Sequence, residues 1–191
     1  MRDEADIKQK LKALVLYWSS TGNTEKVSRT IYETLKGQNI SSSIMKIEEA
    51  KEIELLEYNL IFFGAPSYTW LPPEPVQQFF KDKMKLHHKR GDIKLCAPRL
   101  PEKWAVVFCT YSGPHTGERE AIPACKYIGQ FFEHLGFNVM EEWKIAGEFH
   151  GREEYSTRGP LGDTHGRPNA EDLLNVEKDV LRLIGSLHTD K

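Results

Sequence analysis

Residues 12–27 have the sequence KALVLYWSSTGNTEKV. The first seven of these residues form a short and almost unbroken apolar run, which is typical of a β-strand covered on both faces. The hydroxyl-rich residues SSTGNT follow at 19–24, and from Thr24 to Lys36 apolar side chains recur at helical spacing. A buried strand, a polar loop and an amphipathic helix in this order predict the first unit of an α/β fold.

The rest of the chain continues this alternation. Four further segments have the composition of strands, and they are 40–47, 58–64, 103–110 and 137–147. The second of the five strands is the most polar, so we expect it at a sheet edge. Helical patterns cover 72–88 and 169–187, and a helix after the fourth strand is predicted to direct Ile122, Ile128, Phe132 and Leu135 inward. Strands and helices in strict alternation predict a parallel five-stranded sheet with helices on both faces.

Composition narrows the class of protein. A chain of 191 residues with 39% hydrophobic and 28% charged residues is predicted to be one soluble domain over 1–191, with 1–11 as a flexible tail. The net charge of −2 gives no reason to expect nucleic acid as a partner. We find neither a membrane span nor an apolar leader. Three cysteines without metal spacing predict a reduced cytoplasmic setting and no metal site.

The loop after the first strand is a candidate anion site. In open α/β sheets, ligands bind outside the carboxyl ends of the strands, and a helix N-terminus there attracts negative charge. Neutral donors with one glycine could surround a phosphate, and the candidate residues are Ser19, Ser20, Thr21, Gly22, Asn23 and Thr24. The motifs G-x-x-x-x-G-K-[ST] and G-x-G-x-x-G are missing after this strand. A plain helix cap is the alternative, but it would use only one or two of these side chains.

The pattern Ser19-x-Thr21-Gly22-x-Thr24 after a strand resembles the phosphate loop of the flavodoxin family. This resemblance implies a three-layer flavodoxin-like fold with strand order 2-1-3-4-5. It also implies non-covalent binding of FMN, with the 5′-phosphate of FMN held by residues 19–24. Strand and helix order support the resemblance over about residues 12–188, whereas its motifs are confined to three loops.

If FMN is the ligand, its ring must be held by the loops after the third and fourth strands. The first of these loops supplies the candidates Pro66, Ser67, Tyr68, Thr69 and Trp70. The second supplies Thr110, Tyr111, Ser112, Gly113 and Gly117. Tyr68, Trp70 and Tyr111 are expected to stack on the ring or shield it from water. His115, in the second loop, is expected to be a solvated surface residue.

Three functions remain open at this point. The first is electron transfer to a redox partner protein through bound FMN, for which no catalytic amino acid is needed. The second is an NAD(P)H-dependent FMN or quinone oxidoreductase, which is favoured by the absence of a glycine in the loop after Pro66 and by the long segment 147–168. That segment could cover the ring, bind a nicotinamide cofactor or form a homodimer interface. The third is a non-catalytic interaction module on the same fold.

A basic stretch at 81–94 has six Lys or Arg residues and two Asp residues. A solvated helix end explains it most simply. Its alternative role is a docking patch for an acidic redox partner or for the phosphate of NADPH.

Overall fold

The computed structural model describes residues 11–187. These residues form a five-stranded sheet of order β2-β1-β3-β4-β5, in which all neighbouring strands are parallel. The fold class and the strand order predicted above are therefore confirmed. The strands are β1 (Lys12–Tyr17), β2 (Ser41–Lys46), β3 (Leu60–Pro66), β4 (Trp104–Tyr111) and β5 (Asn138–Ala146).

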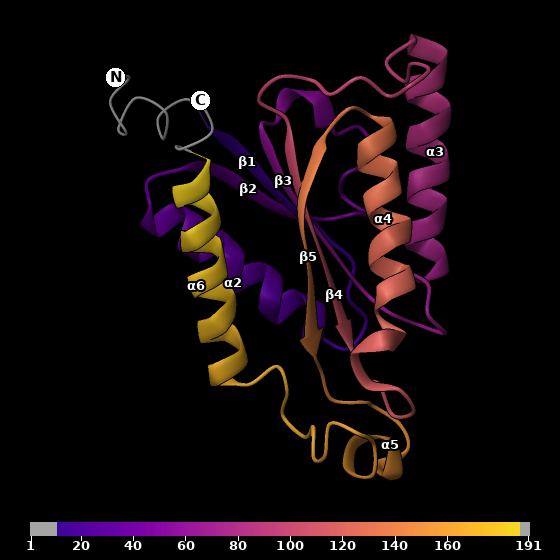
Figure 1. Ribbon diagram of the computed structural model, residues 1–191, viewed down its shortest axis with the longest axis vertical. Coiled ribbons are helices and arrows are strands. Elements are labelled where there is room, and N and C mark those ends of the chain that lie inside the picture. Colours follow the sequence, from indigo (N-terminus) through magenta and orange to yellow (C-terminus); the bar gives the residue numbers. More distant parts are fainter. Residues whose placement is uncertain (1–10, 188–191) are drawn as a thin grey trace.

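Helices cover both faces of the sheet (Figure 1). On one face lie α2 (Asn23–Gly37) and α6 (Ala170–Ser186), and on the other lie α3 (Glu74–Arg90) and α4 (Ile122–His134). Three shorter helical segments are η1 (Leu55–Glu57), η2 (Gly117–Glu120) and α5 (Glu153–Thr157). The last of these falls inside 147–168, a segment whose length predicts either a function or local structure of its own.

Two apolar layers explain why the central strands are apolar throughout. Successive side chains of a strand point to opposite faces. In β3, Phe62 therefore packs beneath α2 and α6, whereas Phe63 packs beneath α3 and α4, and both are fully buried. Phe63 lies against the rings of Phe80 and Phe132, with ring centroids 4.7 and 5.9 Å away. The edge strand β2 is instead half-buried, in agreement with its polar sequence.

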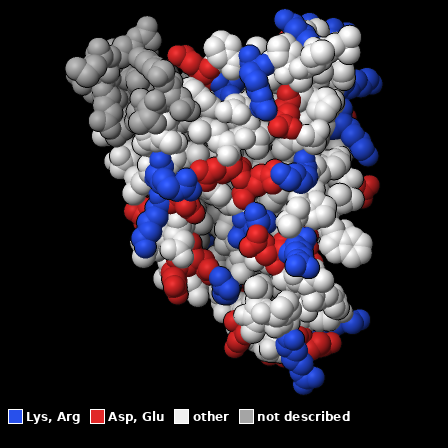
Figure 2. Space-filling model, viewed as in Figure 1, with Lys and Arg blue, Asp and Glu red and all other residues white. Residues whose placement is uncertain are grey.

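The other edge of the sheet is β5, and charged side chains cover it. Glu141 pairs with Arg182 of α6 at 2.6 Å, and Glu142 pairs with Lys126 of α4 at 3.0 Å. Figure 2 shows red and blue side chains interspersed along the middle of this face. Charged side chains on an edge strand oppose strand-to-strand association with other chains.

Two sequence-based expectations concern the N-terminal tail and the inward face of α4. The tail predicted at 1–11 falls almost wholly outside the described residues, and its last residue, Leu11, is buried. The prediction for Ile122 is wrong, because this first residue of α4 is 41% exposed. At about 100° per residue, Ile122 lies roughly 120° around the helix from Ile128. The inward face at this end is supplied by Ala121, Ala124 and Cys125 instead.

Gly64 provides a test of the packing between β3 and β4. It pairs with Phe108 across the two strands, and a Cβ added at Gly64 would lie 2.1 Å from the Phe108 ring. We expect Gly64→Ala to lower the free energy of unfolding by about 1–3 kcal/mol, measured by urea denaturation, because the ring has no free space to move into. Adding Phe108→Leu to this variant should recover part of the loss.

The matched control is Gly37→Ala at the end of α2, where an added Cβ meets nothing within 4 Å. This control should be as stable as the wild type or slightly more stable. Equal stability of Gly64→Ala and wild type would contradict the packing described here.

Candidate functional site

A cavity of about 410 Å³ opens at the carboxyl ends of β1, β3, β4 and β5. This volume is within the usual range for small-molecule sites. Twelve of the predicted site residues line the cavity, and they are Ser19, Ser20, Thr21, Asn23, Thr24, Pro66, Ser67, Tyr68, Thr69, Thr110, Tyr111 and Ser112. The three loops that were singled out in the sequence therefore meet at one place.

Four predicted residues do not line the cavity: Gly22, Trp70, Gly113 and Gly117. Gly22 has a positive φ of 96° and immediately precedes α2, so it turns the chain into the helix. Within the loop after β4, the Gly117 amide donates to the Gly113 carbonyl at 3.0 Å. Trp70 is 57% exposed.

The position of Trp70 follows from a tight turn after β3. Tyr68 and Leu71 exchange two backbone hydrogen bonds of 2.8 and 3.1 Å, which leaves only Thr69 and Trp70 at the tip. Both tip residues have positive φ, 49° and 69°. This turn directs Tyr68 to the cavity, where its hydroxyl lies 2.5 Å from the Ser20 Oγ. The Trp18 and Tyr68 rings also form a T-shaped pair, with centroids 6.1 Å apart.

Hydrogen bonds join the loop after β1 to the neighbouring strands. The buried hydroxyls of Thr24 and Thr110 are 2.8 Å apart, and this bond ties the start of α2 to β4. The Asn23 side chain donates to the Glu148 carbonyl at 2.9 Å, which ties the same helix to the segment after β5. Thr21, by contrast, is exposed at the cavity. Asn23 and Thr24 therefore position the loop, and Thr21 faces the cavity.

The N-terminus of α2 has no side-chain cap, although hydroxyl groups surround it. The N-terminus of α6 differs, because the Asn169 side chain accepts bonds from the amides of Glu171 and Asp172. The plain helix cap considered for residues 19–24 is therefore not what their side chains form. Uncapped first-turn amides are donors for an anion, and the helix dipole adds to this attraction.

The electrostatics of the cavity come from carboxylates and neutral groups. Among the described residues, no Lys or Arg lines the cavity. Two acidic residues, Glu120 and Glu148, line it. Glu120 Oε1 accepts bonds from the amides of His115 and Thr116 at 2.8 and 2.6 Å. Burial raises the pKa of Tyr111, which keeps this phenol neutral at physiological pH. An anionic group in the cavity would thus depend on neutral donors and on the helix end.

Six lining residues were not among the predicted site residues: Pro114, Glu120, Glu148, Phe149, His150 and Tyr155. The last four belong to the segment 147–168, for which covering of the ring was one of three expected roles. Their position directly after β5 is the signal that points to them, because the carboxyl ends of parallel strands share one edge. His115 itself is exposed, and its ring meets the Tyr155 ring at a centroid distance of 5.6 Å.

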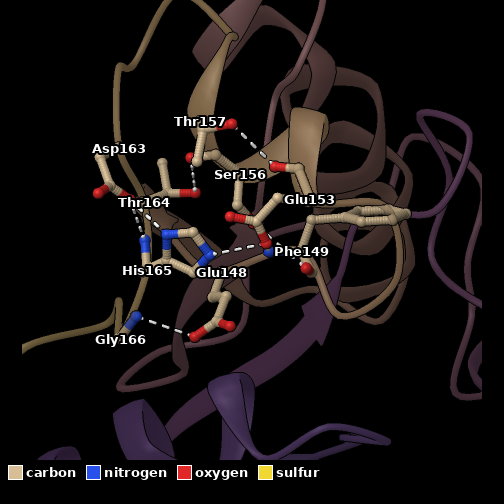
Figure 3. Close-up of polar contacts among 9 residues, drawn as sticks. All are labelled: Glu148, Phe149, Glu153, Ser156, Thr157, Asp163, Thr164, His165 and Gly166. Carbon is tan, nitrogen blue, oxygen red and sulfur yellow. Dashed lines mark hydrogen bonds and ion pairs between the residues drawn. The ribbon is translucent and has the colours of Figure 1, made fainter.

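The residues from Glu148 to Arg167 form a loop closed on itself, called here the β5–α6 loop. The amide of Glu148 donates to the carbonyl of Arg167 at 2.9 Å, so the two ends of the loop meet. Inside it, Ser156 and Thr164 are each only 1% exposed, and the Thr164 amide donates to the Ser156 carbonyl at 2.8 Å. The Ser156 Oγ accepts from the Phe149 amide at 3.1 Å (Figure 3). These bonds hold Phe149 in the cavity wall.

His165 connects two acidic residues on the outer side of this loop (Figure 3). Its Nδ1 lies 2.7 Å from Asp163 Oδ1 and its Nε2 lies 3.3 Å from Glu153 Oε2. Hydrogen bonds first to Asp163 and then to Glu153 raise the pKa of His165 above its ordinary value of 6.5. The charged connection is therefore present while His165 is protonated and both carboxylates are ionised, and it is lost as the pH rises through the raised pKa of His165.

Comparison with known proteins gives a family and a fold. A family model described as a flavodoxin domain matches residues 14–139. Among solved structures, a flavodoxin from the domain Archaea is 18% identical with a TM-score of 0.60, covering 92% of this chain and 99% of its own. Flavodoxin 2 from Bacillus cereus is 20% identical with a TM-score of 0.60, covering 90% and 99%. A WrbA-like flavodoxin from Agrobacterium tumefaciens is 13% identical with a TM-score of 0.61, covering 95% and 100%.

No curated protein sequence matches the chain. Within residues 11–187, no helix combines the length and the apolar composition that crossing a membrane requires. In the same residues, no group of three or more His, Cys, Asp or Glu side chains could hold a metal ion.

The bond between Thr24 and Thr110 can be tested by a double-mutant cycle. Thr24→Val leaves the Thr110 hydroxyl buried without this partner, which should lower the free energy of unfolding by about 1–3 kcal/mol in urea denaturation. The double variant Thr24→Val/Thr110→Val should be more stable than either single variant, because no polar group is then left unpaired. Thr30→Val, at a partly exposed hydroxyl of α2, is the control and should change stability by about 0.5 kcal/mol or less. Strict additivity of the two single changes would contradict the bond.

The pKa of His165 can be measured by NMR titration of its imidazole. We expect a pKa above 6.5 in the wild type and a lower pKa in Asp163→Asn. The carboxylate of Asp163 contributes most to raising the pKa of His165, and this variant removes its charge. Glu154→Gln changes a neighbouring carboxylate that makes no bond to His165, so it should leave this pKa as in the wild type. A titration that Asp163→Asn leaves unaltered would show that the pair does not form in solution.

Proposed function

Since the chain belongs to the flavodoxin domain family, we propose that its cavity binds FMN non-covalently and that the protein transfers electrons through this cofactor to a redox partner protein. The observation that carries the proposal is the uncapped N-terminus of α2, which opens into the cavity beside hydroxyl groups that make no cap. This is an anion site built from neutral donors, and it lies at the edge of the sheet where the neighbouring loops can hold a ring.

The residues present fit FMN at both of its ends. The phosphate would be held by the hydroxyls of Ser19, Ser20 and Thr21 together with the first-turn amides of α2. The ring would lie between the loops after β3 and β4, where Tyr68 and Tyr111 line the cavity. FMN, when bound, supplies the redox chemistry.

The chain's own contribution is binding, orientation and electrostatics. The contact between Tyr68 and Ser20 connects the ring side of the cavity to the phosphate side. Glu120 and Glu148 place negative charge at the cavity without any lining cation, which disfavours further negative charge there. Because reduction adds negative charge to a bound flavin, these acidic surroundings should lower the reduction potential of the flavin and favour its role as an electron donor. No side chain is assigned a covalent or acid–base role.

A second function is favoured by one observation. The β5–α6 loop adds Phe149, His150 and Tyr155 to the cavity, so the site extends beyond the three loops that FMN itself requires. An NAD(P)H-dependent FMN or quinone oxidoreductase would need such additional room for a second small molecule. The cavity offers no lining cation for the phosphates of a nicotinamide nucleotide. We therefore rank electron transfer to a protein first.

The binding proposal is tested by comparing FMN with riboflavin, which lacks the phosphate. Purified protein should quench FMN fluorescence at much lower concentration than riboflavin fluorescence. Thr21→Ala should weaken FMN binding about 10- to 150-fold, since a hydrogen bond to a charged group contributes about 1.5–3 kcal/mol. Riboflavin binding should be unchanged in this variant, and Thr21→Ser should retain FMN affinity. Equal affinity for the two flavins, or binding of neither, would refute the phosphate site.

Stopped-flow mixing separates the two candidate functions. FMN-loaded protein is mixed with NADH or NADPH in the absence of oxygen, and visible flavin absorbance is followed. Rapid bleaching by either nucleotide would establish the oxidoreductase and displace our first choice. We expect bleaching that is slow compared with reduction by dithionite.

A further inference from the structure

An exposed apolar turn lies at the end of the molecule opposite the cavity. It belongs to residues 91–103, called here the α3–β4 loop, which run from the end of α3 to the start of β4. Leu95 is 96% exposed, and no other large hydrophobic side chain in residues 11–187 has a higher exposed fraction. The Ala97 amide donates to the Lys94 carbonyl at 3.1 Å, so Leu95 projects from a hydrogen-bonded turn. Pro98 and Leu100 extend the exposed apolar surface.

Three lysines without a salt bridge in residues 11–187 lie in the last part of α3 and in the turn itself. Lys85 and Lys89 are four residues apart on α3, hence on one face of the helix, and Lys94 precedes Leu95. All three are exposed, and none is in a salt bridge within residues 11–187. Figure 2 shows blue side chains gathered over the upper part of α3, as this helix is placed in Figure 1.

Two carboxylates of this region contact other side chains rather than these three lysines. Asp92 lies 2.8 Å from the buried His87, and Glu54 pairs with Arg90. The exposed acids of the same stretch are Asp82 and Glu102. The turn therefore combines a free apolar side chain with a local excess of positive charge.

We propose that the α3–β4 loop contacts an anionic lipid surface, with Leu95 inserted among the acyl chains and Lys85, Lys89 and Lys94 close to the lipid phosphates. Interfacial binding of this kind needs a small apolar insertion together with diffuse positive charge. A protein interface instead needs a packed core from which lysine is depleted. The α3–β4 loop has a single exposed leucine with lysines and no packed apolar core, which is the composition expected for contact with a lipid surface.

The position of the loop makes this contact compatible with an open cavity. The loop precedes β4, and the cavity lies beyond the other end of the same strand, with its eight residues spanning roughly 26 Å. Figure 1 shows the loop and α5 at opposite ends of the molecule. A protein bound to lipid through Leu95 would direct its cavity away from the membrane. Contact with lipid through this loop does not require FMN in the cavity.

Co-sedimentation with vesicles tests the contact. The full chain is mixed at low salt with vesicles of phosphatidylcholine alone or of phosphatidylcholine with phosphatidylserine. Binding is expected only with phosphatidylserine and should weaken as salt is raised. Lys89→Glu/Lys94→Glu should reduce the partition coefficient about tenfold or more. Leu95→Asp should reduce it about tenfold as well, because the apolar insertion is lost.

Matched variants on the other face of the sheet serve as controls. Lys36→Glu/Lys178→Glu makes the same change in net charge on α2 and α6, and Leu181→Asp changes a leucine of α6 that is 39% exposed. Both should bind vesicles as the wild type does. Equal losses in the control and test variants would show that net charge alone matters and would overturn the proposal. Binding to immobilised polyglutamate without binding to vesicles would overturn it in favour of an acidic protein.

Discussion

The buried hydrogen bond between Thr24 and Thr110 is the interaction on which the site depends. A parallel sheet brings the carboxyl ends of its strands to one edge, but it does not by itself fix the loops that follow them. This bond holds the start of α2 against the end of β4, and the bond from Asn23 to Glu148 extends the connection beyond β5. The uncapped end of α2 is thereby fixed at the cavity, so its amides do not have to be ordered before they can act as donors.

The fold could be predicted because fully buried parallel strands have a distinctive sequence. β1, β3 and β4 are apolar on both faces, and the half-buried β2 is visibly more polar. The phase of a helix is harder to predict at its ends. Ile122 is apolar but lies roughly 120° around α4 from the inward Ile128, and the fully buried Ala121 takes the inward place instead.

The site was predictable in its loops and less so in its side chains. The sequence places Tyr68 and Trp70 in one loop, but only the turn with positive φ at Thr69 and Trp70 decides which aromatic ring meets the cavity. Such a conformation is uncommon for residues other than glycine and has no sequence signal here. The position of 147–168 after β5 points to that segment as a whole, but it does not single out Phe149 and Tyr155. Their positions depend on Ser156 and Thr164, whose hydrogen bonds follow no periodic pattern.

The closed form of the β5–α6 loop has a consequence for how such a protein can change. Its first and last residues are hydrogen-bonded to each other, and its buried polar groups are satisfied from within. The intervening chain can therefore lengthen, shorten or be replaced without displacing β5 or α6, since closing a longer loop costs little additional free energy. The β5–α6 loop forms one wall of the cavity. Its replacement would alter which ligands the cavity admits, while the sheet and the N-terminus of α2 stay the same.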